Sequence, residues 1–491
     1  MKRSQQILLG LSALAIFALI YSIHLDYHLP YHIDEWHHIN EAVRLGNYGE
    51  YFDVLKSVQA NRFSGIEIGF HFFLFLLSFI VNLVSAYEFL PAIWAVLSAL
   101  TLFFVVYKKT DNNFWISWLA MAFFASIKSN VNITGLWFFT PLTFSLPFIF
   151  LYFYFFSEGI EKNNNKYLLI SLAIMLLLLP THSISVIFAL PALLIYCLIS
   201  IKKIAKRPWI FALFAAMAAV GLLFYKFILS LGWNEVAGHL LSSLQFPVGW
   251  GVIEAKLPMT EVYGWFGYLA ALLGLTAIIL RKEIGRYSIY LIWPVTVFIM
   301  IIAYLITGVS YLSPYQRNLY YFAIALPILS AMGIYYSLDW IWGRLIKLRL
   351  NEKTLTLTRY AIVAIGSMAM LFFLFADYFD VPKQFALYQA LTKDDRQILD
   401  YLAIQPRSTV MAAPLISTTL FSYAHKDPVG DLSFYGNPRE VMNFYLSDDC
   451  AKQENIIKYF AVKYIISPFE IKCYFVKLIK SNSSDYLYLV E

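Results

Sequence analysis

A short segment near the N-terminus, residues 31–41, carries the residue types best suited to chemistry. Asp34 and Glu35 are adjacent carboxylates, and His37 and His38 follow within one helical turn. Side chains three and four positions apart share one face of a helix, so Asp34 is expected to lie beside the two histidines. A carboxylate in such a group can act as a general base that takes a proton from a hydroxyl or amide nucleophile.

Two other interpretations of this segment stay open. Asp34, Glu35 and His38 could hold a divalent cation such as Mg or Mn, since carboxylate oxygens and imidazole nitrogens are metal ligands. The segment could also be an acidic amphipathic helix on the membrane surface, with its acids placed favourably at the helix N-terminus. In every case a helix is predicted, with Asp34 as its N-cap and with its end at Leu45, before Gly46.

Other candidate residues are basic or polar side chains next to apolar segments. Arg62 leads into an apolar run at 68–84, and Arg317 begins a later apolar segment. The planar guanidinium group of either residue suits phosphate, although an arginine at a membrane surface can also serve only as an anchor. His182 lies in a short turn, where it could cap a helix end. The candidate substrate-binding residues are Arg62, Arg317, His37, His38, Glu67 and His182.

These residues must be positioned by a membrane-embedded scaffold. Of the 491 residues, 60% are hydrophobic, 18% aromatic and 14% charged, which excludes a soluble globular enzyme and a disordered chain. Apolar segments close to the roughly 20 residues needed to span a bilayer recur along the chain. About eleven spans are predicted, at 7–25, 89–107, 114–130, 136–156, 167–180, 184–200, 209–231, 263–280, 287–307, 317–337 and 360–379.

The segment 68–84 is apolar too, but a full crossing there would reverse the side of every later loop. It is predicted to be a re-entrant or interfacial hairpin, in which His71 is a buried, satisfied histidine. Lys and Arg clusters fall in alternate loops, which indicates a cytoplasmic N-terminus. The expected location is the plasma (inner) membrane of a bacterium or archaeon, with the loops 26–67 and 234–262 and the tail 380–491 outside.

The tail has a different composition and predicts a small α/β domain. Helices are predicted at 394–403 and 453–460, and strands at 409–413, 463–467 and 486–490. Cys450 and Cys473 could pair if this domain faces an oxidising space. The chain is therefore expected to consist of a membrane domain, 1–379, and an extracytoplasmic α/β domain, 380–491.

Several well-known chemical motifs are missing from the sequence. It has no P-loop, no dinucleotide-binding glycine pattern and no Cys-x-x-Cys pair. An enzyme on the outer face has no nucleotide supply, so it must take activated groups from lipid-linked donors. An arginine could then stabilise the phosphate of a lipid leaving group. The net charge of +6 lies mostly in short loops and gives no reason to expect a nucleic-acid partner.

The arrangement of these features resembles the GT-C superfamily of membrane glycosyltransferases. This superfamily includes protein O-mannosyltransferases, the aminoarabinose transferase of lipid A and oligosaccharyltransferases. Its members carry an acidic motif in the first outer loop, here Asp34-Glu35, and a second large outer loop after the seventh span, here 234–262. Their first loop leads through a basic residue into an apolar stretch, as at Arg62, and many have an extracytoplasmic C-terminal domain.

The resemblance implies an inverting transfer of a hexose or pentose from a polyprenyl-phosphate donor to a glycan, glycolipid or protein of the cell envelope. It implies that Asp34 is the base, that Glu35 is its neighbour or a metal contact, and that Arg62 and Arg317 are phosphate partners. Under this interpretation no metal is required, and a Mg or Mn ion is the open alternative.

Two departures from oligosaccharyltransferases favour transfer of a single sugar. The segment 128–134 holds no second acidic motif, and no tryptophan follows Trp342, so the Trp-Trp-Asp signature is missing. The rival functions are a transporter or flippase of lipid-linked glycans, a glycan polymerase and a non-catalytic scaffold. The candidate charges lie at the outer interface rather than in mid-span, which favours surface chemistry over transport.

Overall fold

The computed structural model describes residues 1–46, 67–129, 134–205, 258–346, 389–432 and 436–491, with isolated positions between 209 and 247. It divides into two compact units. Unit 1 comprises Met1–Ser22, Arg62–Gly69 and Leu90–Lys383, and unit 2 comprises Ile23–Asn61, Phe70–Phe89 and Gln384–Glu491. The division before the tail falls close to the expected boundary at 379/380, but most of the predicted first outer loop groups with the tail.

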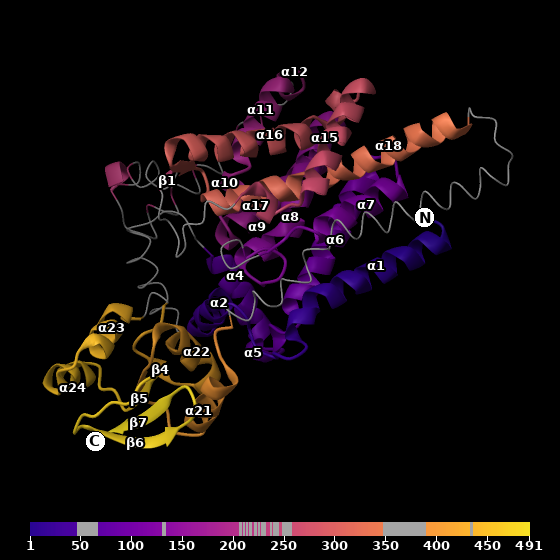
Figure 1. Ribbon diagram of the computed structural model, residues 1–491. Coiled ribbons are helices and arrows are strands. Elements are labelled where there is room, and N and C mark those ends of the chain that lie inside the picture. Colours follow the sequence, from indigo (N-terminus) through magenta and orange to yellow (C-terminus); the bar gives the residue numbers. More distant parts are fainter. Residues whose placement is uncertain are drawn as a thin grey trace. The chain divides into compact units, whose positions relative to one another are not determined.

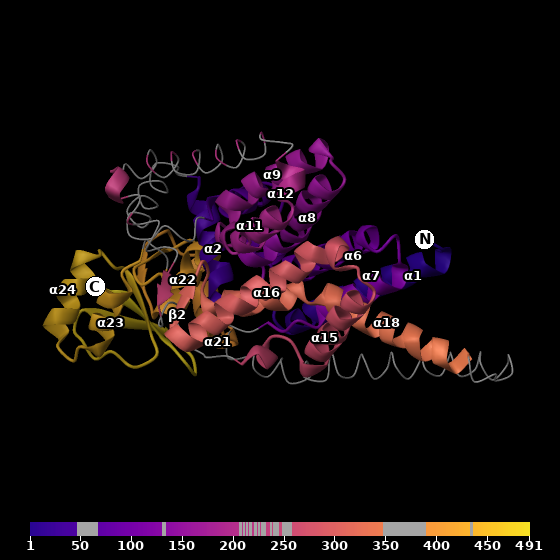
Figure 2. The ribbon, with the colours of Figure 1, turned by 90° about the horizontal axis from the view of Figure 1, so that it is seen from above.

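Unit 1 contains the helices α1 (Arg3–Tyr21), α6 (Leu90–Lys109), α7 (Phe114–Ala125), α8 (Pro141–Glu161), α9 (Asn165–Thr181), α10 (Ile184–Ile187), α11 (Leu190–Ile199), α12 (Ile201–Ile204), α15 (Trp265–Leu280), α16 (Ile284–Thr307), α17 (Tyr315–Ala325) and α18 (Pro327–Ile346). They pack side by side (Figures 1 and 2). α6 lies against α1, α7 and α8, while α18 lies against α7 and α15. α9 packs on α8, and α16 contacts α11 and α17.

Five segments among the described residues are long and apolar enough to cross a membrane: Arg3–His24, Leu90–Lys109, Pro141–Glu161, Ile284–Thr307 and Tyr315–Arg344. Shorter apolar helices occupy Ile68–Ser78, Phe114–Ala125, Asn165–Thr181, Ile184–Ile199 and Trp265–Leu280. Each of these segments overlaps an apolar segment predicted from the sequence. The predicted span 360–379 lies outside the described residues and 209–231 lies mostly outside them, so the number of about eleven spans stays a prediction.

Charged side chains from loops predicted to share one side of the membrane meet within unit 1. Nζ of Lys109, at the end of α6, lies 2.7 Å from a carboxylate oxygen of Glu158 and of Glu161 in α8. Nη2 of Arg286 in α16 donates to the Lys109 carbonyl oxygen at 2.6 Å and lies 2.7 Å from Asp111. The structure thus brings together loops that the charge pattern assigns to one side.

α15 and α18 cross closely because each has a glycine at the contact. A Cβ added at Gly333 would lie 1.9 Å from the carbonyl oxygen of Ala270, and one at Gly274 would lie 1.9 Å from that of Leu329. Backbone atoms cannot move aside like a side chain, so a larger residue would push the helices apart. Small residues at such crossings are common in membrane helices.

Unit 2 contains the predicted α/β domain. Its elements are α21 (Lys393–Ala403), β3 (Thr409–Met411), α22 (Pro414–Ala424), β4 (Asp427–Pro428), α23 (Pro438–Leu446), α24 (Cys450–Tyr459), β5 (Tyr464–Ser467), β6 (Val476–Ser481) and β7 (Tyr486–Val490). The strands form one sheet in the order β4-β3-β5-β7-β6. β3 is parallel to β4 and β5, whereas β7 is antiparallel to β5 and β6. Every helix and strand predicted in the tail is present; α22, α23, β4 and β6 were not predicted.

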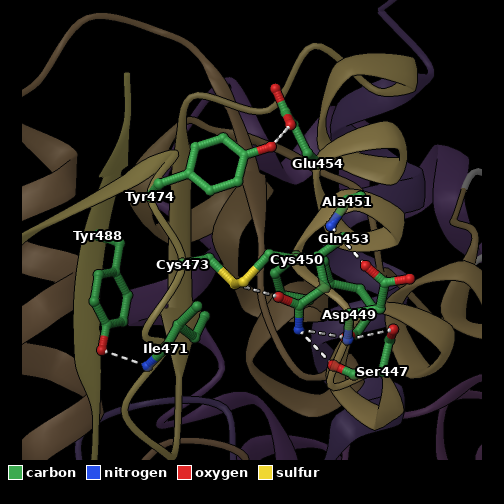
Figure 3. The surroundings of a disulfide bond; sticks show 11 residues. Ser447, Asp449, Cys450, Ala451, Gln453, Glu454, Ile471, Cys473, Tyr474 and Tyr488 are labelled. Atoms are coloured by element: carbon green, nitrogen blue, oxygen red, sulfur yellow. Dashed lines mark hydrogen bonds between the residues drawn. A yellow bond between two sulfur atoms is a disulfide. The ribbon is translucent and has the colours of Figure 1, made fainter.

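A disulfide between Cys450 and Cys473 joins the start of α24 to the segment before β6 (Figure 3). Asp449 caps α24 by accepting a hydrogen bond from the Ala451 N–H at 2.9 Å. The pairing that the sequence left open is therefore formed in the structure.

Unit 2 also contains α2 (Ile33–Arg44), which lies in the predicted first outer loop, α4 (Ile68–Ser78) from Phe70 onward, and α5 (Leu83–Ala86). α2 packs on α22 of the α/β domain. Nδ2 of Asn40 donates to the Thr418 carbonyl oxygen at 2.6 Å, and Trp36 lies edge-on to Tyr423 with ring centroids 6.3 Å apart. The apolar side of α2 is thus buried on the α/β domain, which corrects the interpretation of α2 as a membrane-surface helix.

The segment predicted as a hairpin at 68–84 is helical. α4 has 11 residues, about half the length needed to cross a bilayer. A turn follows it, and Asn82 then caps the short helix α5 by accepting from the Ser85 N–H at 3.2 Å. The placement of this segment as a re-entrant or interfacial hairpin stays a prediction.

Candidate active site

The chain enters α2 through a histidine cap. Nδ1 of His32 accepts a hydrogen bond from the backbone N–H of Asp34 at 3.1 Å. In return, the carboxylate of Glu35 accepts from the backbone N–H groups of Tyr31 and His32, at 2.8 and 3.0 Å. This reciprocal arrangement is a capping box. The prediction that Asp34 is the N-cap is therefore wrong, because His32 takes that position and Asp34 lies inside the first turn.

The two carboxylates of the acidic motif consequently differ in environment. Glu35 is fully buried, and its carboxylate shapes the start of the helix. The Asp34 side chain is 47% exposed, and its Oδ2 lies 3.6 Å from Nδ1 of His32. The N-terminus of a helix favours a negative charge. Asp34 is thus an accessible carboxylate, whereas Glu35 is a structural one.

Three imidazole rings gather between α2 and α4. Nδ1 of His38 lies 3.0 Å from Nε2 of His71 in α4. The His37 ring centroid lies 5.3 Å from that of His38 and 6.4 Å from that of His71. Both His38 and His71 are buried. The structure confirms the prediction that His71 is a buried, hydrogen-bonded histidine, and it identifies His38 as its partner.

Acidic and basic groups continue along the same helix. Oε1 of Glu41 lies 4.0 Å from Nδ1 of His37, and Nη2 of Arg44 lies 3.5 Å from Oδ2 of Asp431. Burial raises the pKa of Glu41 to about 8, although Arg44 opposes this shift. Burial also lowers the pKa of His37, against the opposite influence of Asp431 and Asp34. Burial thus favours the neutral forms of Glu41 and His37.

Two other candidate residues lie together in unit 1. Nη1 of Arg317, in the first turn of α17, donates to Oγ1 of Thr134 at 2.8 Å. His182 is the C-cap of α9, and its Nδ1 lies 2.6 Å from Oγ of Ser185, which lies 3.1 Å from the Tyr321 hydroxyl. Burial, together with the charge of Arg317, lowers the pKa of His182 to about 3. His182 is therefore a neutral ring within the electrostatic influence of Arg317.

Part of the predicted second outer loop lies next to the segment that carries Arg317. β1 (Gln245–Pro247) pairs antiparallel with β2 (Val309–Tyr311), which precedes α17. The predicted span 317–337 is divided into α17 and α18 at Pro327. Proline has no backbone N–H to continue the hydrogen-bond ladder and tolerates the first position of a new helix.

The predicted site residues therefore fall into two groups, one in each unit. Arg62 lies outside the described residues, and Glu67 is the residue directly before α4. The sequence reasoning missed Arg44 and Asp431 as members of the polar cluster on α2. These two residues are 387 positions apart, so no local pattern relates them.

No protein-family model matches the sequence, and no curated protein sequence matches it. Solved structures match its fold. The archaeal oligosaccharyltransferase AglB from Archaeoglobus fulgidus, in complex with an inhibitory peptide and a dolichol-phosphate, has a TM-score of 0.57 and 13% identity, over 95% of this chain and 69% of its own. ArnT from Cupriavidus metallidurans, in the apo state, has a TM-score of 0.52 and 12% identity, over 98% of this chain and 97% of its own. Both belong to the GT-C superfamily of membrane glycosyltransferases, and this chain has the same fold.

Proposed function

We propose that this chain is a membrane glycosyltransferase that moves one sugar from a polyprenyl-phosphate donor to an acceptor of the cell envelope. The observation that carries the proposal is the accessible carboxylate of Asp34 at the start of a largely buried helix, in a chain with the GT-C fold. One of the AglB structures contains a dolichol-phosphate, which is the kind of lipid carrier proposed for the donor here.

The proposed reaction is a single displacement. The acceptor hydroxyl oxygen attacks the anomeric carbon of the sugar, and its proton passes to the Asp34 carboxylate. The bond between the anomeric carbon and the phosphate oxygen breaks, and its electron pair leaves with the lipid phosphate. One displacement of this kind inverts the anomeric configuration. Arg317 and Arg62 are proposed to bind the phosphate, since a guanidinium group pairs with it through parallel hydrogen bonds.

The contacts of the remaining candidates favour supporting roles. Glu35 accepts two backbone hydrogen bonds at the start of α2, so we assign it to positioning Asp34 rather than to proton transfer. His182 lies within the electrostatic influence of Arg317, and we assign it to the donor-binding region of unit 1. His37 lies beside Glu41, and its role is to hold the polar side of α2.

Two observations support the finer points of the proposal. The chain aligns with 97% of ArnT but with 69% of AglB, and it lacks the second acidic motif at 128–134; both favour transfer of one hexose or pentose. The Cys450–Cys473 disulfide is typical of an oxidising compartment. It therefore supports an outer location of the tail and of the first loop, with glycans, glycolipids or proteins of the envelope as acceptors.

The test uses purified full-length protein with radiolabelled polyprenyl-phosphate sugars, and measures transfer or hydrolysis of the sugar. Asp34→Asn is expected to reduce turnover by about 100-fold or more, because loss of a general base has that effect. Asp26→Asn is the matched control, since Asp26 is an exposed acid of the same loop. Full activity of Asp34→Asn would exclude this base, and failure to consume any lipid-linked sugar would contradict the function and favour transport.

A further inference from the structure

A row of three hydrogen-bonded side chains in unit 1 ends at His182, between α9 and α10. Nδ1 of His182 lies 2.6 Å from Oγ of Ser185, and that oxygen lies 3.1 Å from the Tyr321 hydroxyl. The three residues are 3%, 1% and 0% exposed. The Tyr321 ring stacks on that of Phe188, with centroids 3.7 Å apart. The row is thus buried and is held in place at its Tyr321 end.

Only one direction of the hydrogen bonds in this row gives every buried proton an acceptor. Among the described residues, the Tyr321 hydroxyl makes a single hydrogen bond, to Ser185, so its proton lies on that bond. Ser185 then donates its own proton to Nδ1 of His182. Nδ1 is therefore the acceptor nitrogen of a neutral ring, and Nε2 carries the hydrogen. The reverse direction would leave the proton of a fully buried tyrosine without an acceptor, which is unfavourable.

The role of His182 as a helix cap does not occupy its ring. It is the backbone N–H of His182 that caps α9, by donating to the Leu178 carbonyl oxygen at 2.8 Å. Within the described part of the chain, the ring makes one hydrogen bond, through Nδ1. Polar groups of buried residues are nearly always hydrogen-bonded, so the N–H at Nε2 indicates a partner that the described residues do not supply.

Arg317 shows what chemistry that partner has. Arg317 and Tyr321 are four positions apart in α17, so their side chains share one face of the helix. The row from Tyr321 to His182 therefore starts on the face of α17 that carries the guanidinium group. Burial and the charge of Arg317 lower the pKa of His182 to about 3, so the ring stays neutral. A neutral N–H beside a guanidinium group suits a phosphate, because it adds a hydrogen bond without a second positive charge.

We propose that His182 binds the lipid phosphate of the sugar donor directly, by donating a hydrogen bond from Nε2, and that Ser185 and Tyr321 position its ring. This role rests on the proposed function, in which Arg317 binds the same phosphate. When the bond between the anomeric carbon and the phosphate oxygen breaks, the electron pair stays on that oxygen and the phosphate gains one negative charge. The hydrogen bond from Nε2 strengthens as this charge develops. No proton leaves His182 in this step.

The experiment measures how purified full-length protein in detergent binds two lipids, a polyprenyl phosphate and the matching polyprenol without the phosphate. The wild type is expected to prefer the phosphate. His182→Ala is expected to bind the phosphate about 10-fold or more weakly, because a hydrogen bond to a charged group is lost, and to bind the polyprenol as before. His182→Gln keeps an N–H near the position of Nε2 and is expected to stay within about threefold of the wild type.

The positioning role of the row is tested by Tyr321→Phe. This variant removes the hydroxyl that fixes the direction of the row and keeps the ring that stacks on Phe188. It is expected to weaken binding of the phosphate about threefold, since the ring can then also carry its hydrogen on Nδ1. Tyr263→Phe is the matched control and is expected to leave the affinity unchanged. Tyr263 is also a buried tyrosine whose hydroxyl lies 2.8 Å from a serine hydroxyl, that of Ser330.

A second apolar variant keeps the test decisive if alanine prevents folding. His182→Leu fills the space of the ring without a hydrogen-bond donor and is expected to behave like His182→Ala. Binding of the phosphate by His182→Leu as tightly as by the wild type, an equal loss of affinity for both lipids, or equal effects of Tyr321→Phe and Tyr263→Phe would overturn the role of His182 and leave the proposed function standing. A wild type that binds the two lipids equally would contradict the proposed function, and this role with it.

Discussion

The most direct test of how α2 is held is removal of its last-turn arginine. Arg44 lies 3.5 Å from Asp431, with its side chain 12% exposed and that of Asp431 fully buried. Its guanidinium carbon also lies 4.4 Å from the centroid of the Phe421 ring. The variant Arg44→Ala leaves the Asp431 carboxylate buried without this partner. We therefore expect α2 to separate from the α/β domain more often.

The size of the expected loss of stability in Arg44→Ala follows from the burial of the ion pair rather than from its distance. Breaking a buried ion pair by removing one partner costs about 3–5 kcal/mol, and the long 3.5 Å contact places Arg44→Ala at about 2–3 kcal/mol. Arg407→Ala is the matched control. Arg407 lies only 2.7 Å from Asp427, but the two side chains are 69% and 44% exposed, so this shorter pair contributes less than about 1 kcal/mol.

Hydrogen exchange of the native protein measures this difference. The amides of α2 are expected to exchange about 30- to 150-fold faster in Arg44→Ala, which corresponds to about 2–3 kcal/mol. The amides of the β4 region in Arg407→Ala are expected to change by less than about fivefold. Equal effects of the two variants, or unchanged exchange of α2 in Arg44→Ala, would refute the reasoning that burial decides the strength of these pairs.

Three further predictions concern other parts of the chain. Replacing Cys450 and Cys473 together by serine is expected to destabilise the α/β domain by about 3 kcal/mol, because the disulfide closes a loop with a separation of 23 residues. Hydrogen exchange of the amides of α24 and β6 measures this loss of stability. Burial raises the pKa of Asp485 to about 6 from 3.8. The destabilising negative charge of this carboxylate is therefore absent below about pH 4 and complete above about pH 6. Asp485→Asn is expected to slow hydrogen exchange of the β7 amides at pH 7 but not at pH 4. Gly333→Leu is expected to prevent close packing of α15 and α18 and to lower the Tm, whereas Gly343→Leu on the same helix meets open space and leaves the Tm unchanged.

Each of these three predictions has a result that would contradict it. For the disulfide, it is unchanged exchange after both cysteines are replaced. For Asp485, it is a stabilisation by asparagine that is equal at both pH values, since an effect of charge must follow the titration of the group. For the glycines, it is an equal loss of thermal stability in both leucine variants, which would mean that any large residue on α18 is harmful.

Much of the secondary structure could be predicted because local patterns encode it. The helix of the acidic motif follows from carboxylates and histidines at helical spacing, and the strands β5 and β7 follow from runs of β-branched and aromatic residues. β6 was not predicted because it is a largely exposed edge strand with lysines, a composition that protects sheet edges from association but weakens the strand signal.

The site could be predicted only where its residues are close in sequence. The N-cap prediction failed because aspartate is the stronger intrinsic cap, whereas Glu35 reaches back and makes His32 the cap instead. The contact of His38 with His71 joins residues 33 positions apart. No spacing rule relates such residues, because tertiary packing alone decides that they meet.

The packing of α2 on α22 also has a consequence for how the protein folds during its synthesis. Asn40 and its hydrogen-bond partner Thr418 are separated by 378 positions, so a long stretch of chain must be translated before the helix that carries Asp34 can dock. Until then its apolar side lacks the surface that will cover it, and contacts of such long range form slowly. A nascent chain interrupted before the α/β domain would therefore present Asp34 on a helix without its support. Newly synthesised molecules can place Asp34 on a supported helix only after α22 has been translated.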